Sequence, residues 1–428
     1  MRLACGRVQY VRSKAGYSHP ILKPYRVPHP ALTGVGAQRS FRGKGKWSVL
    51  SRGEQSDDDV VEGWGSTLRS APMVAIMVIN YNGLRWLPRC LSSVQNTEYL
   101  NFEVCLIDNA SGDDSVKYVR ENYPSVKIIQ NPRNLGFAEA YNRIIENTDA
   151  ELVVLLNNDT EILNPLWLDK LVAIINHRPE VGAVACKMVS TNEPSLLESV
   201  GTMGVRFWRG FADIGWGERD VGQYSVSFEP FGFCGGAALV RRDAFLKAGE
   251  FDEKFFVYAE DVDLSWRLRL LGWKIGYCPD AVVAHVRGAS AWGAMLTGPR
   301  IYYGLRNVLR AILKNCGSSL GWALRNFAIF ATFAFFGFAA FEPRTAYAPL
   351  RAAIWNLRHL GDTLRYRHVV QRSRKTAESE ILRAMYPFLQ RHDDGYMGHD
   401  TARALVTNLL DRGQSKSFYK RAWSRANS

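Results

Sequence analysis

The chain has 428 residues, of which 47% are apolar and 12% aromatic, enough for one large domain with appendages. Its seven cysteines include no CxxC pair, which argues against a disulfide framework or a zinc site and leaves a reducing cytosolic setting as the default. The net charge of +13 is concentrated in basic flanks, since residues 1–53 contain eleven Lys and Arg and no Asp or Glu. No zinc-finger spacing, RNP-like aromatic motif or basic heptad repeat accompanies these flanks. We therefore expect no nucleic-acid partner and favour an anionic membrane surface.

The first seventy residues predict a disordered, basic N-terminal extension (residues 1–70). Four prolines and the basic run at 42–46 break any periodicity. The segment is Arg-rich and acid-poor like a transit peptide, but it lacks a clear amphipathic helix and the apolar region of a secretory signal. Ordered structure is expected to begin at Met73.

From Met73 onward, continuous apolar runs alternate with helical patterns. Such runs predict strands that are buried on both faces, and the stretches between them carry apolar residues at helical spacing. The alternation predicts an α/β fold with a Rossmann-like, mostly parallel sheet flanked by helices. The strand candidates are residues 73–79, 102–107, 126–129 and 151–156.

Polar clusters follow three of these strand candidates. They are Asn80–Asn82, Asp108 and Asn157–Asp159. In doubly wound sheets, ligands bind beyond the carboxyl ends of the strands, so the three clusters are expected to converge on one crevice. The alternative for each cluster alone is ordinary turn chemistry.

A later stretch combines acidic residues with the start of a helix. Glu260, Asp261 and Asp263 come where an apolar lead-in gives way to a pattern of leucines at helical spacing. The positive end of a helix dipole favours ionised carboxylates there, although a charged N-cap before a solvated face is the alternative. His285 ends a later apolar run, and its alternative role is a hydrogen bond to a neighbouring carbonyl.

With these motifs in place, the sequence resembles the family 2 glycosyltransferases with a GT-A fold, most closely the rhamnosyltransferase-like branch. The likeness covers roughly residues 72–315, and its motifs occur in the order of the family. These motifs are VINYNG at 78–83, IDNAS at 107–111, NLGFAEAYN at 134–142, LNNDT at 156–160, FGFCGGAALVRRDAF at 231–245, the run GEFDEKFFVYAEDVDLSWRL from 249, and AHVRGAS at 284–290.

The resemblance implies a catalytic domain at residues 71–300 and roles for individual residues. It implies that Asp261 is the catalytic base and that Asp159 binds a metal, with His285 as a further metal ligand. Asn157 stands where the family's DxD-type motif usually begins with an aspartate, so one charge for a cation is missing. The expected donor-binding residues are Asn80, Tyr81, Asn82, Asp108, Asn134 and Asn158, and the expected acceptor-binding residues are Gly235, Gly236, Glu260 and Asp263.

The chemistry of sugar transfer agrees with these roles. Negative charge develops on the leaving diphosphate of a nucleoside-diphosphate sugar, and a cation such as Mn²⁺ or Mg²⁺ neutralises it. The chain has no Gly-rich phosphate loop with a Walker lysine, which makes a metal the natural electrophile. A carboxylate can accept the proton of the acceptor hydroxyl, and direct attack then inverts the anomeric centre.

The C-terminal part predicts amphipathic and apolar helices that associate with a membrane, at residues 301–370. Residues 320–341 carry a single charge, but the uninterrupted apolar part, Phe327–Phe341, is only fifteen residues long. Spanning, re-entrant and interfacial placements therefore all remain open. Residues 371–428 read as a polar, basic tail.

Together these features predict an inverting, metal-dependent glycosyltransferase at the cytoplasmic face of the cell membrane, either peripheral or single-span. It would transfer one sugar, with rhamnose as the expected sugar, to a cell-envelope glycan or a lipid-linked acceptor. A processive synthase is disfavoured because the QxxRW motif is missing. The alternative from another class is a catalytically silent, membrane-tethered module that binds a sugar or a nucleotide.

Overall fold

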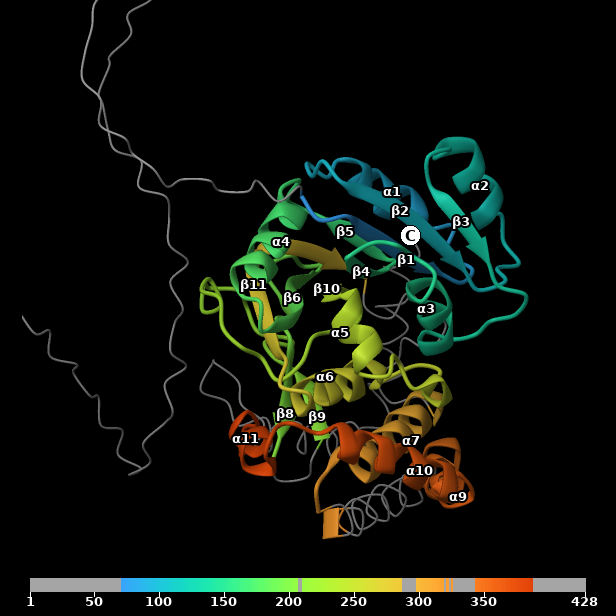
Figure 1. Ribbon diagram of the computed structural model, residues 1–428. Helices are drawn as coiled ribbons and strands as arrows, with labels where there is room; N and C mark the ends of the chain where they lie inside the picture. The colour runs from blue at the N-terminus through green and yellow to red at the C-terminus, as the bar shows by residue number, and fades with distance from the viewer. Residues whose placement is uncertain are drawn as a thin grey trace, which may run out of the picture.

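The computed structural model (Figure 1) is centred on a twisted sheet with helices on both faces. The residues that the structure describes are 71–206, 210–286, 298–318, 321–322, 325 and 343–387. The predicted extension at 1–70 and most of the predicted tail at 371–428 lie outside them.

The main sheet has nine strands, in the order β3-β2-β1-β4-β10-β6-β11-β5, and β7 pairs with β6 beside this path. A separate two-stranded sheet joins β8 and β9. The strand bounds are β1 Val74–Asn80, β2 Phe102–Asp108, β3 Lys127–Gln130, β4 Leu152–Asn157, β5 Thr160–Ile162, β6 Val181–Ser190, β7 Leu197–Ser199, β8 Thr202–Val205, β9 Gly210–Asp213, β10 Ala237–Arg241 and β11 Lys274–His285.

The prediction of a mostly parallel sheet is correct only in part, because four of the eight strand pairings in the main sheet are parallel, that of β6 with β11 among them. Strands β1 to β4 pair in parallel, as expected from the βαβ alternation. Strand β10 then enters antiparallel between β4 and β6, and β5 pairs antiparallel with β11, so the sheet is mixed. The sequence hides this because a buried strand is a continuous apolar run whichever way it points.

Helices cover both faces of the sheet and bury two separate apolar cores. Helices α1, α2 and α4 pack on one face. Helices α3, α5 and α6 pack on the other. This double cover explains why β1 and β4 read as unbroken apolar runs rather than alternating ones. The bounds are α1 Leu87–Gln95, α2 Ser115–Asn122, α3 Ala138–Ile145, α4 Trp167–His177, α5 Arg242–Lys247 and α6 Glu260–Leu270.

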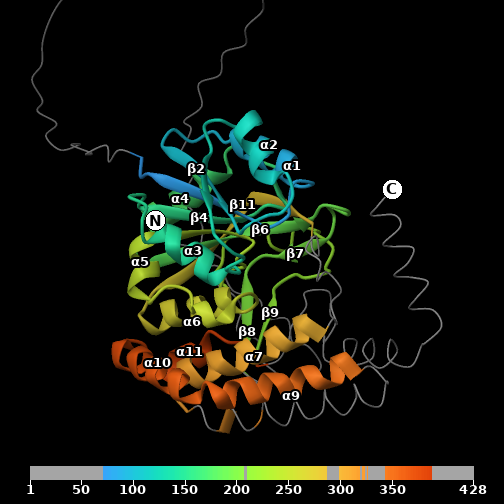
Figure 2. The ribbon, with the colours of Figure 1, turned by 90° about the vertical axis from the view of Figure 1, so that its right-hand side faces the viewer.

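The C-terminal helices form a further layer against α6 (Figure 2). Their bounds are α7 Gly298–Asn315, α9 Pro343–Arg358, α10 Leu360–Ser373 and α11 Glu378–Arg383. Trp266 and Leu270 of α6 share a small core with Ile312 of α7 and Val370 of α10. The helices that the sequence assigned to a membrane region are therefore also packed against the catalytic-domain side of the fold.

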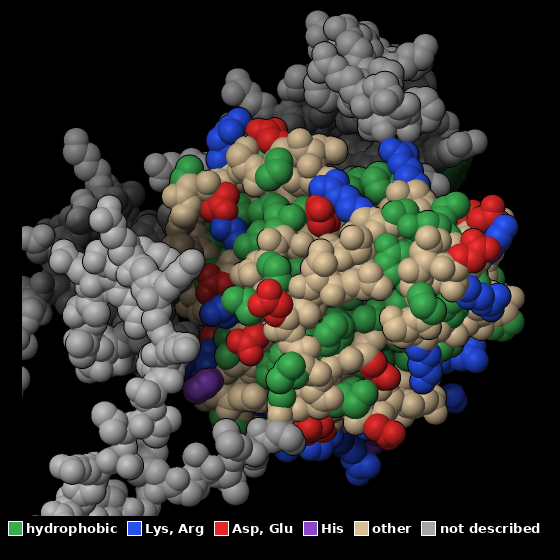
Figure 3. Space-filling model, turned by 90° about the horizontal axis from the view of Figure 1, so that it is seen from above, with side chains coloured by type: hydrophobic (Ala, Val, Ile, Leu, Met, Phe, Trp, Pro, Cys, Tyr) green, Lys and Arg blue, Asp and Glu red, His purple; other side chains and the backbone are tan. Residues whose placement is uncertain are grey.

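Within the described ranges, no helix is both long enough and apolar enough to cross a bilayer. The apolar run Phe327–Phe341 lies outside the described residues. Seen from above (Figure 3), acidic and basic side chains are interspersed on the described surface. The excess positive charge of the chain is therefore not concentrated on this face.

Candidate active site

A hydrogen-bonded network joins the carboxyl ends of β1, β2 and β4. Asn80 Nδ2 donates to Asp108 Oδ1 at 3.0 Å, and Asn158 Nδ2 donates to Asn80 Oδ1 at 2.6 Å. Ser111, which the sequence interpretation did not select, donates from Oγ to Asp108 Oδ1 at 2.6 Å and accepts from the N–H of Asn82. The parallel register of β1 with β2, which sets Asn80 opposite Asp108, brings these residues together. The predicted convergence of the strand ends is confirmed for this group.

The remaining predicted donor residues lie around this network in different settings. Asn82 Oδ1 accepts from the N–H of Gly112 at 2.7 Å and so ties the loop after β1 to the loop after β2. The Tyr81 side chain is 51% exposed. Asn134 accepts from the N–H of Gly136 at 2.9 Å, in a turn before α3. That bond is ordinary turn chemistry.

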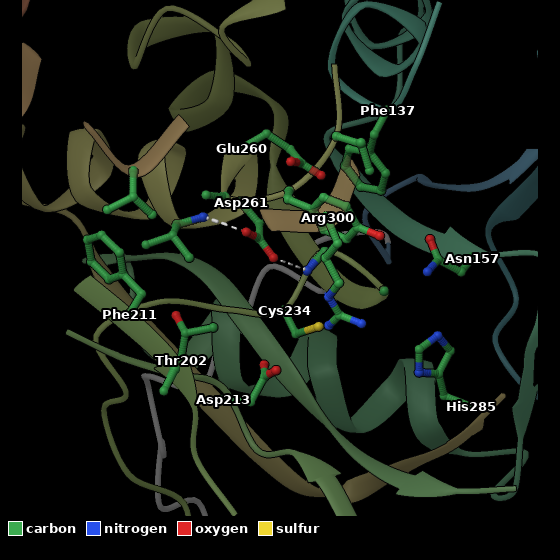
Figure 4. A pocket seen from close by; sticks show the side chains of 18 of the residues that line it. Phe137, Asn157, Thr202, Phe211, Asp213, Cys234, Glu260, Asp261, His285 and Arg300 are labelled. Atoms are coloured by element: carbon green, nitrogen blue, oxygen red, sulfur yellow. Dashed lines mark hydrogen bonds between the residues drawn. The ribbon is translucent and has the colours of Figure 1, made fainter. Parts of the chain in front are cut away.

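A pocket of about 370 Å³ adjoins the network. The end of β4 separates the two, because Asn157 and Asp159 line the pocket while Asn158 bonds to Asn80. None of the six predicted donor-binding side chains lines the pocket itself. Its wall includes the predicted residues Asp159, Gly235, Gly236, Glu260, Asp261 and His285 (Figure 4).

Asp261 projects into the pocket from the first turn of α6 (Figure 4). Its Oδ2 accepts the N–H of Gly235 at 2.8 Å, and its Oδ1 accepts the N–H of Val262 at 2.7 Å. Burial raises the pKa of Asp261 and Asp213 raises it further, against the opposing hydrogen bond from Gly235, to about 6. A carboxylate with a pKa near 6 is ionised at neutral pH and is a competent proton acceptor.

Glu260, beside Asp261, is 5% exposed and lines the same wall. Burial and the neighbouring carboxylate of Asp261 raise its pKa well above the usual range. Its Oε2 has no hydrogen-bond partner among the described residues. A neutral carboxyl in this position could donate a hydrogen bond to a ligand, which distinguishes it chemically from Asp261.

Gly235 and Gly236 line the pocket, and at both positions the neighbours leave little room for a side chain. A Cβ on Gly235 would lie 3.0 Å from the Phe137 ring, and a Cβ on Gly236 would lie 2.9 Å from Met188 Cε. Gly235 contributes the N–H that orients Asp261. The glycines thus hold the catalytic candidate close to the sheet.

Asp159 and His285 meet because β5, which follows Asp159, pairs antiparallel with β11, which ends at His285. Asp159 Oδ1 lies 3.3 Å from His285 Nε2. The other ring nitrogen, Nδ1, is 2.6 Å from Glu198 Oε2 on β7. Burial lowers the pKa of His285, but the carboxylates of Asp159 and Glu198 outweigh it and raise the pKa to about 9.

This arrangement fits a divalent cation held by two side chains. Apart from its contact with His285 Nε2, Asp159 Oδ1 is buried and has no hydrogen-bond partner among the described residues. Glu198 occupies Nδ1 and so leaves Nε2 of His285 to face Asp159, as in the carboxylate–histidine pairs that support metal ligands. No group of three or more His, Cys, Asp or Glu side chains within the described ranges is arranged to hold a metal. A cation here would therefore also need oxygens from a ligand such as a diphosphate.

The comparisons with known proteins identify the family of one part of the chain. Residues 75–249 match the model of glycosyl transferase family 2. They form a family 2 glycosyltransferase domain. The N-acetylglucosaminyl-diphospho-decaprenol L-rhamnosyltransferase of Mycobacterium tuberculosis is 29% identical over 239 residues, which cover 51% of this chain and 77% of that protein. The O-antigen biosynthesis protein RfbC of Myxococcus xanthus is 29% identical over 237 residues, or 52% of this chain but only 18% of that protein.

Among solved structures, this chain resembles GalNAc-T7, whose crystal structure contains UDP, GalNAc and Mn²⁺. The TM-score is 0.51 at 15% sequence identity, and the match covers 74% of this chain and 56% of that one. At this identity the likeness shows a shared GT-A-like fold.

One predicted acceptor residue of the glycosyltransferase is misplaced. Asp263 does not line the pocket and is fully buried on the opposite side of α6. It pairs with Arg267 at 2.9 Å and Lys314 at 3.0 Å, and it accepts from Asn315 at 2.9 Å. A carboxylate with three such partners has no capacity left for an acceptor sugar, so the assignment of Asp263 was wrong. The spacing explains the error, because residues two apart on a helix point in different directions.

The sequence interpretation also missed several pocket residues. Asp213 lines the pocket and Glu198 contacts His285 from outside it, and both come from short strands that carry no motif. The buried hydroxyl of Thr202 lines the pocket without a hydrogen-bond partner among the described residues. Arg300, near the start of α7, is the one Lys or Arg side chain that lines the described pocket, and Figure 4 shows its guanidinium projecting inward. Of these residues, only Arg300 could have been noticed in the sequence, because it is a basic residue close to the motif around His285.

Proposed function

We propose that this protein is an inverting, divalent-metal-dependent glycosyltransferase. It transfers a single sugar from a nucleoside-diphosphate donor to a cell-envelope glycan or a lipid-linked acceptor. The observation that carries the proposal is the position of two kinds of group around one pocket. Asp261 projects from the α6 wall, and His285 lies away from it across the pocket (Figure 4), paired with Asp159.

In this proposal Asp261 acts on the acceptor. Its carboxylate takes the proton of the acceptor hydroxyl while the acceptor oxygen forms a bond to the anomeric carbon of the donor sugar. The bond from that carbon to the diphosphate breaks, and the electron pair leaves with the nucleoside diphosphate. One displacement of this kind inverts the anomeric configuration and needs no nucleophile from the protein. The N–H of Gly235, 2.8 Å from Oδ2, holds the carboxylate in place for the transfer.

Asp159 and His285 would hold the cation, with Glu198 fixing the ring of His285. When bound, a divalent cation neutralises the charge that develops on the leaving diphosphate. At neutral pH the raised pKa of His285 means that cation binding displaces a proton from the ring. Nitrogen donors favour Mn²⁺ over Mg²⁺, so Mn²⁺ is the preferred ion in this proposal.

Arg300 is proposed to bind the donor diphosphate. It is the one Lys or Arg side chain lining the described pocket. Its guanidinium lies 5.4 Å from the ring centroid of Tyr258, in the loop just before α6. Guanidinium groups bind phosphate oxygens with two parallel hydrogen bonds. Asn157 leaves the metal site with one carboxylate fewer to hold a cation. The positive charge of Arg300 would add to the neutralisation of the diphosphate there.

The donor nucleoside is assigned to the network of Asn80, Asp108 and Asn158, beside the pocket. Rhamnose is proposed as the sugar because the mycobacterial relative is named for L-rhamnosyl transfer. The match with this chain covers 77% of that relative. The same name supports a lipid-linked diphosphate sugar as the acceptor class.

The protein is proposed to act at the cytoplasmic face of the membrane. On α9, Leu350, Ile354 and Leu357 are 52%, 38% and 62% exposed and follow one another at helical spacing. Arg351 and Arg358 are exposed beside them. An apolar strip edged by arginines suits the headgroup region of an anionic bilayer.

A donor panel tests the proposed activity. Purified protein is incubated with Mn²⁺ and with UDP-, dTDP- or GDP-sugars, in the presence and absence of a lipid-linked diphosphate sugar, and released nucleoside diphosphate is measured. We expect release from one donor class that depends on Mn²⁺ and increases with acceptor. Tight donor binding without release under any condition would instead support a catalytically silent binding module.

A further inference from the structure

The loop that leads into the catalytic helix has an unusual backbone. Phe256, Tyr258 and Ala259 have φ values of 63°, 72° and 64°, and none of them is glycine. Side chains disfavour this left-handed region, so neighbouring contacts must hold the loop in place. Ala259 is the N-cap of α6 and offers no side-chain cap. The direction of the first turn, and with it the position of Asp261, therefore depends on contacts made by the loop backbone.

Asn307 of α7 supplies these contacts. Its Nδ2 lies 3.0 Å from the carbonyl oxygen of Phe255, 2.9 Å from that of Val257 and 2.7 Å from that of Tyr258. The amide has two hydrogens, so it is shared among three acceptors in a row. Asn307 is fully buried, which makes each of these bonds costly to lose.

Arg306, the preceding residue, adds further hydrogen bonds to the same stretch of backbone. Its guanidinium donates to the carbonyl oxygens of Lys254 and Phe255, each at 2.6 Å. These carbonyls belong to the short 3₁₀ helix Glu253–Phe255, just before the loop. Two consecutive side chains of α7 thus bind the backbone on the N-terminal side of Asp261.

Helix α7 also holds the other side of Asp261. Lys314 and Asn315 bind the carboxylate of Asp263, two residues after it, as described above. Asp261 is therefore bracketed by contacts from a single helix that lies outside the matched family domain at 75–249. Such bracketing fixes the start of α6 relative to the pocket.

We propose that Asn307 is a positioning residue that fixes the strained loop before α6 and thereby aims Asp261 at the acceptor hydroxyl. The proposal rests on the proposed function for the role of Asp261, whereas the loop contacts themselves do not. It assigns part of the catalytic geometry to α7, which follows the last family motif at 284–290.

The test compares two buried asparagines. Leu has the branched shape of Asn but no donor, so Asn307→Leu removes the amide bonds without leaving a cavity. Asn356→Leu is the matched control, since Asn356 is also buried and donates to two helix carbonyls, of Arg306 and Ala352, but does not contact the loop. Should N307L not fold, N307D keeps the size of the side chain and loses both amide hydrogens.

Two measurements decide the outcome. Amide hydrogen exchange in the peptide spanning residues 255–263 should be about tenfold faster in N307L than in N356L, the effect of losing roughly one buried hydrogen bond. The kcat of N307L should fall about 10²-fold with the donor KM within threefold of wild type, because a misaimed base impairs transfer rather than donor binding. N356L should retain kcat within about twofold.

Equal hydrogen exchange in the two variants would show that Asn307 does not hold the loop, whether or not the chain is a transferase. Faster exchange in N307L with an unchanged kcat would show that the loop does not aim Asp261. If wild-type protein turns over no donor, the proposed function fails, and the exchange comparison still decides whether Asn307 holds the loop.

Discussion

Replacing Asp261 by Asn separates its chemical role from its structural one. Asn has the same size, and its Oδ1 can still accept the N–H of Gly235, although it cannot also accept the N–H of Val262. The pocket should therefore keep its overall shape. The amide cannot accept the proton of an acceptor hydroxyl, and loss of a general base lowers kcat by on the order of 10²–10⁴-fold. Donor binding should change little because the donor groups lie elsewhere, in the Asn80 network and at Asp159.

The pH dependence gives the same variant a second signature. With a pKa of about 6, Asp261 is ionised above this pH, so wild-type kcat should fall on the acid side as pH drops through about 6. D261N should lose this acid limb in its residual activity. The assay is nucleoside-diphosphate release from saturating donor between pH 5 and 8.5, in buffers of constant ionic strength.

The raised pKa also predicts an effect on stability. The folded protein binds the proton of Asp261 more tightly than the unfolded chain, whose model value is 3.8, so this group stabilises the fold most below pH 3.8. That contribution is lost as pH rises from about 3.8 through about 6. At 1.36 kcal/mol per pKa unit the loss is about 3 kcal/mol, and the opposing hydrogen bond from Gly235 is already included in the pKa of about 6.

D261N should therefore be at least as stable as wild type at pH 7.5, as measured by denaturant unfolding. A variant that transfers sugar at near wild-type rate, or that keeps the acid limb, would refute the assignment of Asp261 as the base. A large loss of stability at pH 7.5 would show instead that the charge holds the fold together.

Further predictions concern the other parts of the site and the membrane. His285→Ala should raise the Mn²⁺ concentration for half-maximal activity, and Glu198→Gln should raise it about 10- to 100-fold through the ring orientation; an unchanged metal titration in both would make His285 structural. Arg300→Ala should raise the donor KM about 10- to 100-fold, the value of a charged hydrogen bond, and an unchanged KM would exclude contact with the diphosphate. Lys at both Leu350 and Leu357 should weaken sedimentation with anionic vesicles at least tenfold, while equal binding would place the membrane contact elsewhere.

Much of the fold could be predicted from local sequence. The apolar runs and the polar turns after them gave the parallel strands β1 to β4 because each strand and the helix after it are local units. The antiparallel insertion of β10 could not be predicted, since the direction of a buried strand leaves no trace in its composition. The packing of α7 and α10 against α6 was also hidden, because the same amphipathic pattern suits a lipid surface and a protein surface.

The site divides along similar lines. Asn80, Asp108 and Asn158 were predictable because strand ends converge in parallel sheets, and the structure places them in one network. The Asp159–His285 contact spans 126 positions of sequence and depends on the pairing of β5 with β11. Asp263 was misassigned because three neighbouring carboxylates look alike in sequence, whereas a helix sends them to different surroundings.

The three carboxylates at the start of α6 illustrate how burial and partners divide like groups among roles. Asp263 has Arg267, Lys314 and Asn315 as partners and serves the packing of α7 against α6. Glu260 is buried, and burial and the neighbouring Asp261 raise its pKa well above the usual range. Asp261 has one loop N–H and a place on the pocket wall, which leave it ionised and able to accept a proton. The raised pKa of Glu260 also serves this role, because a second ionised carboxylate beside Asp261 would raise the pKa of the base and oppose its ionisation.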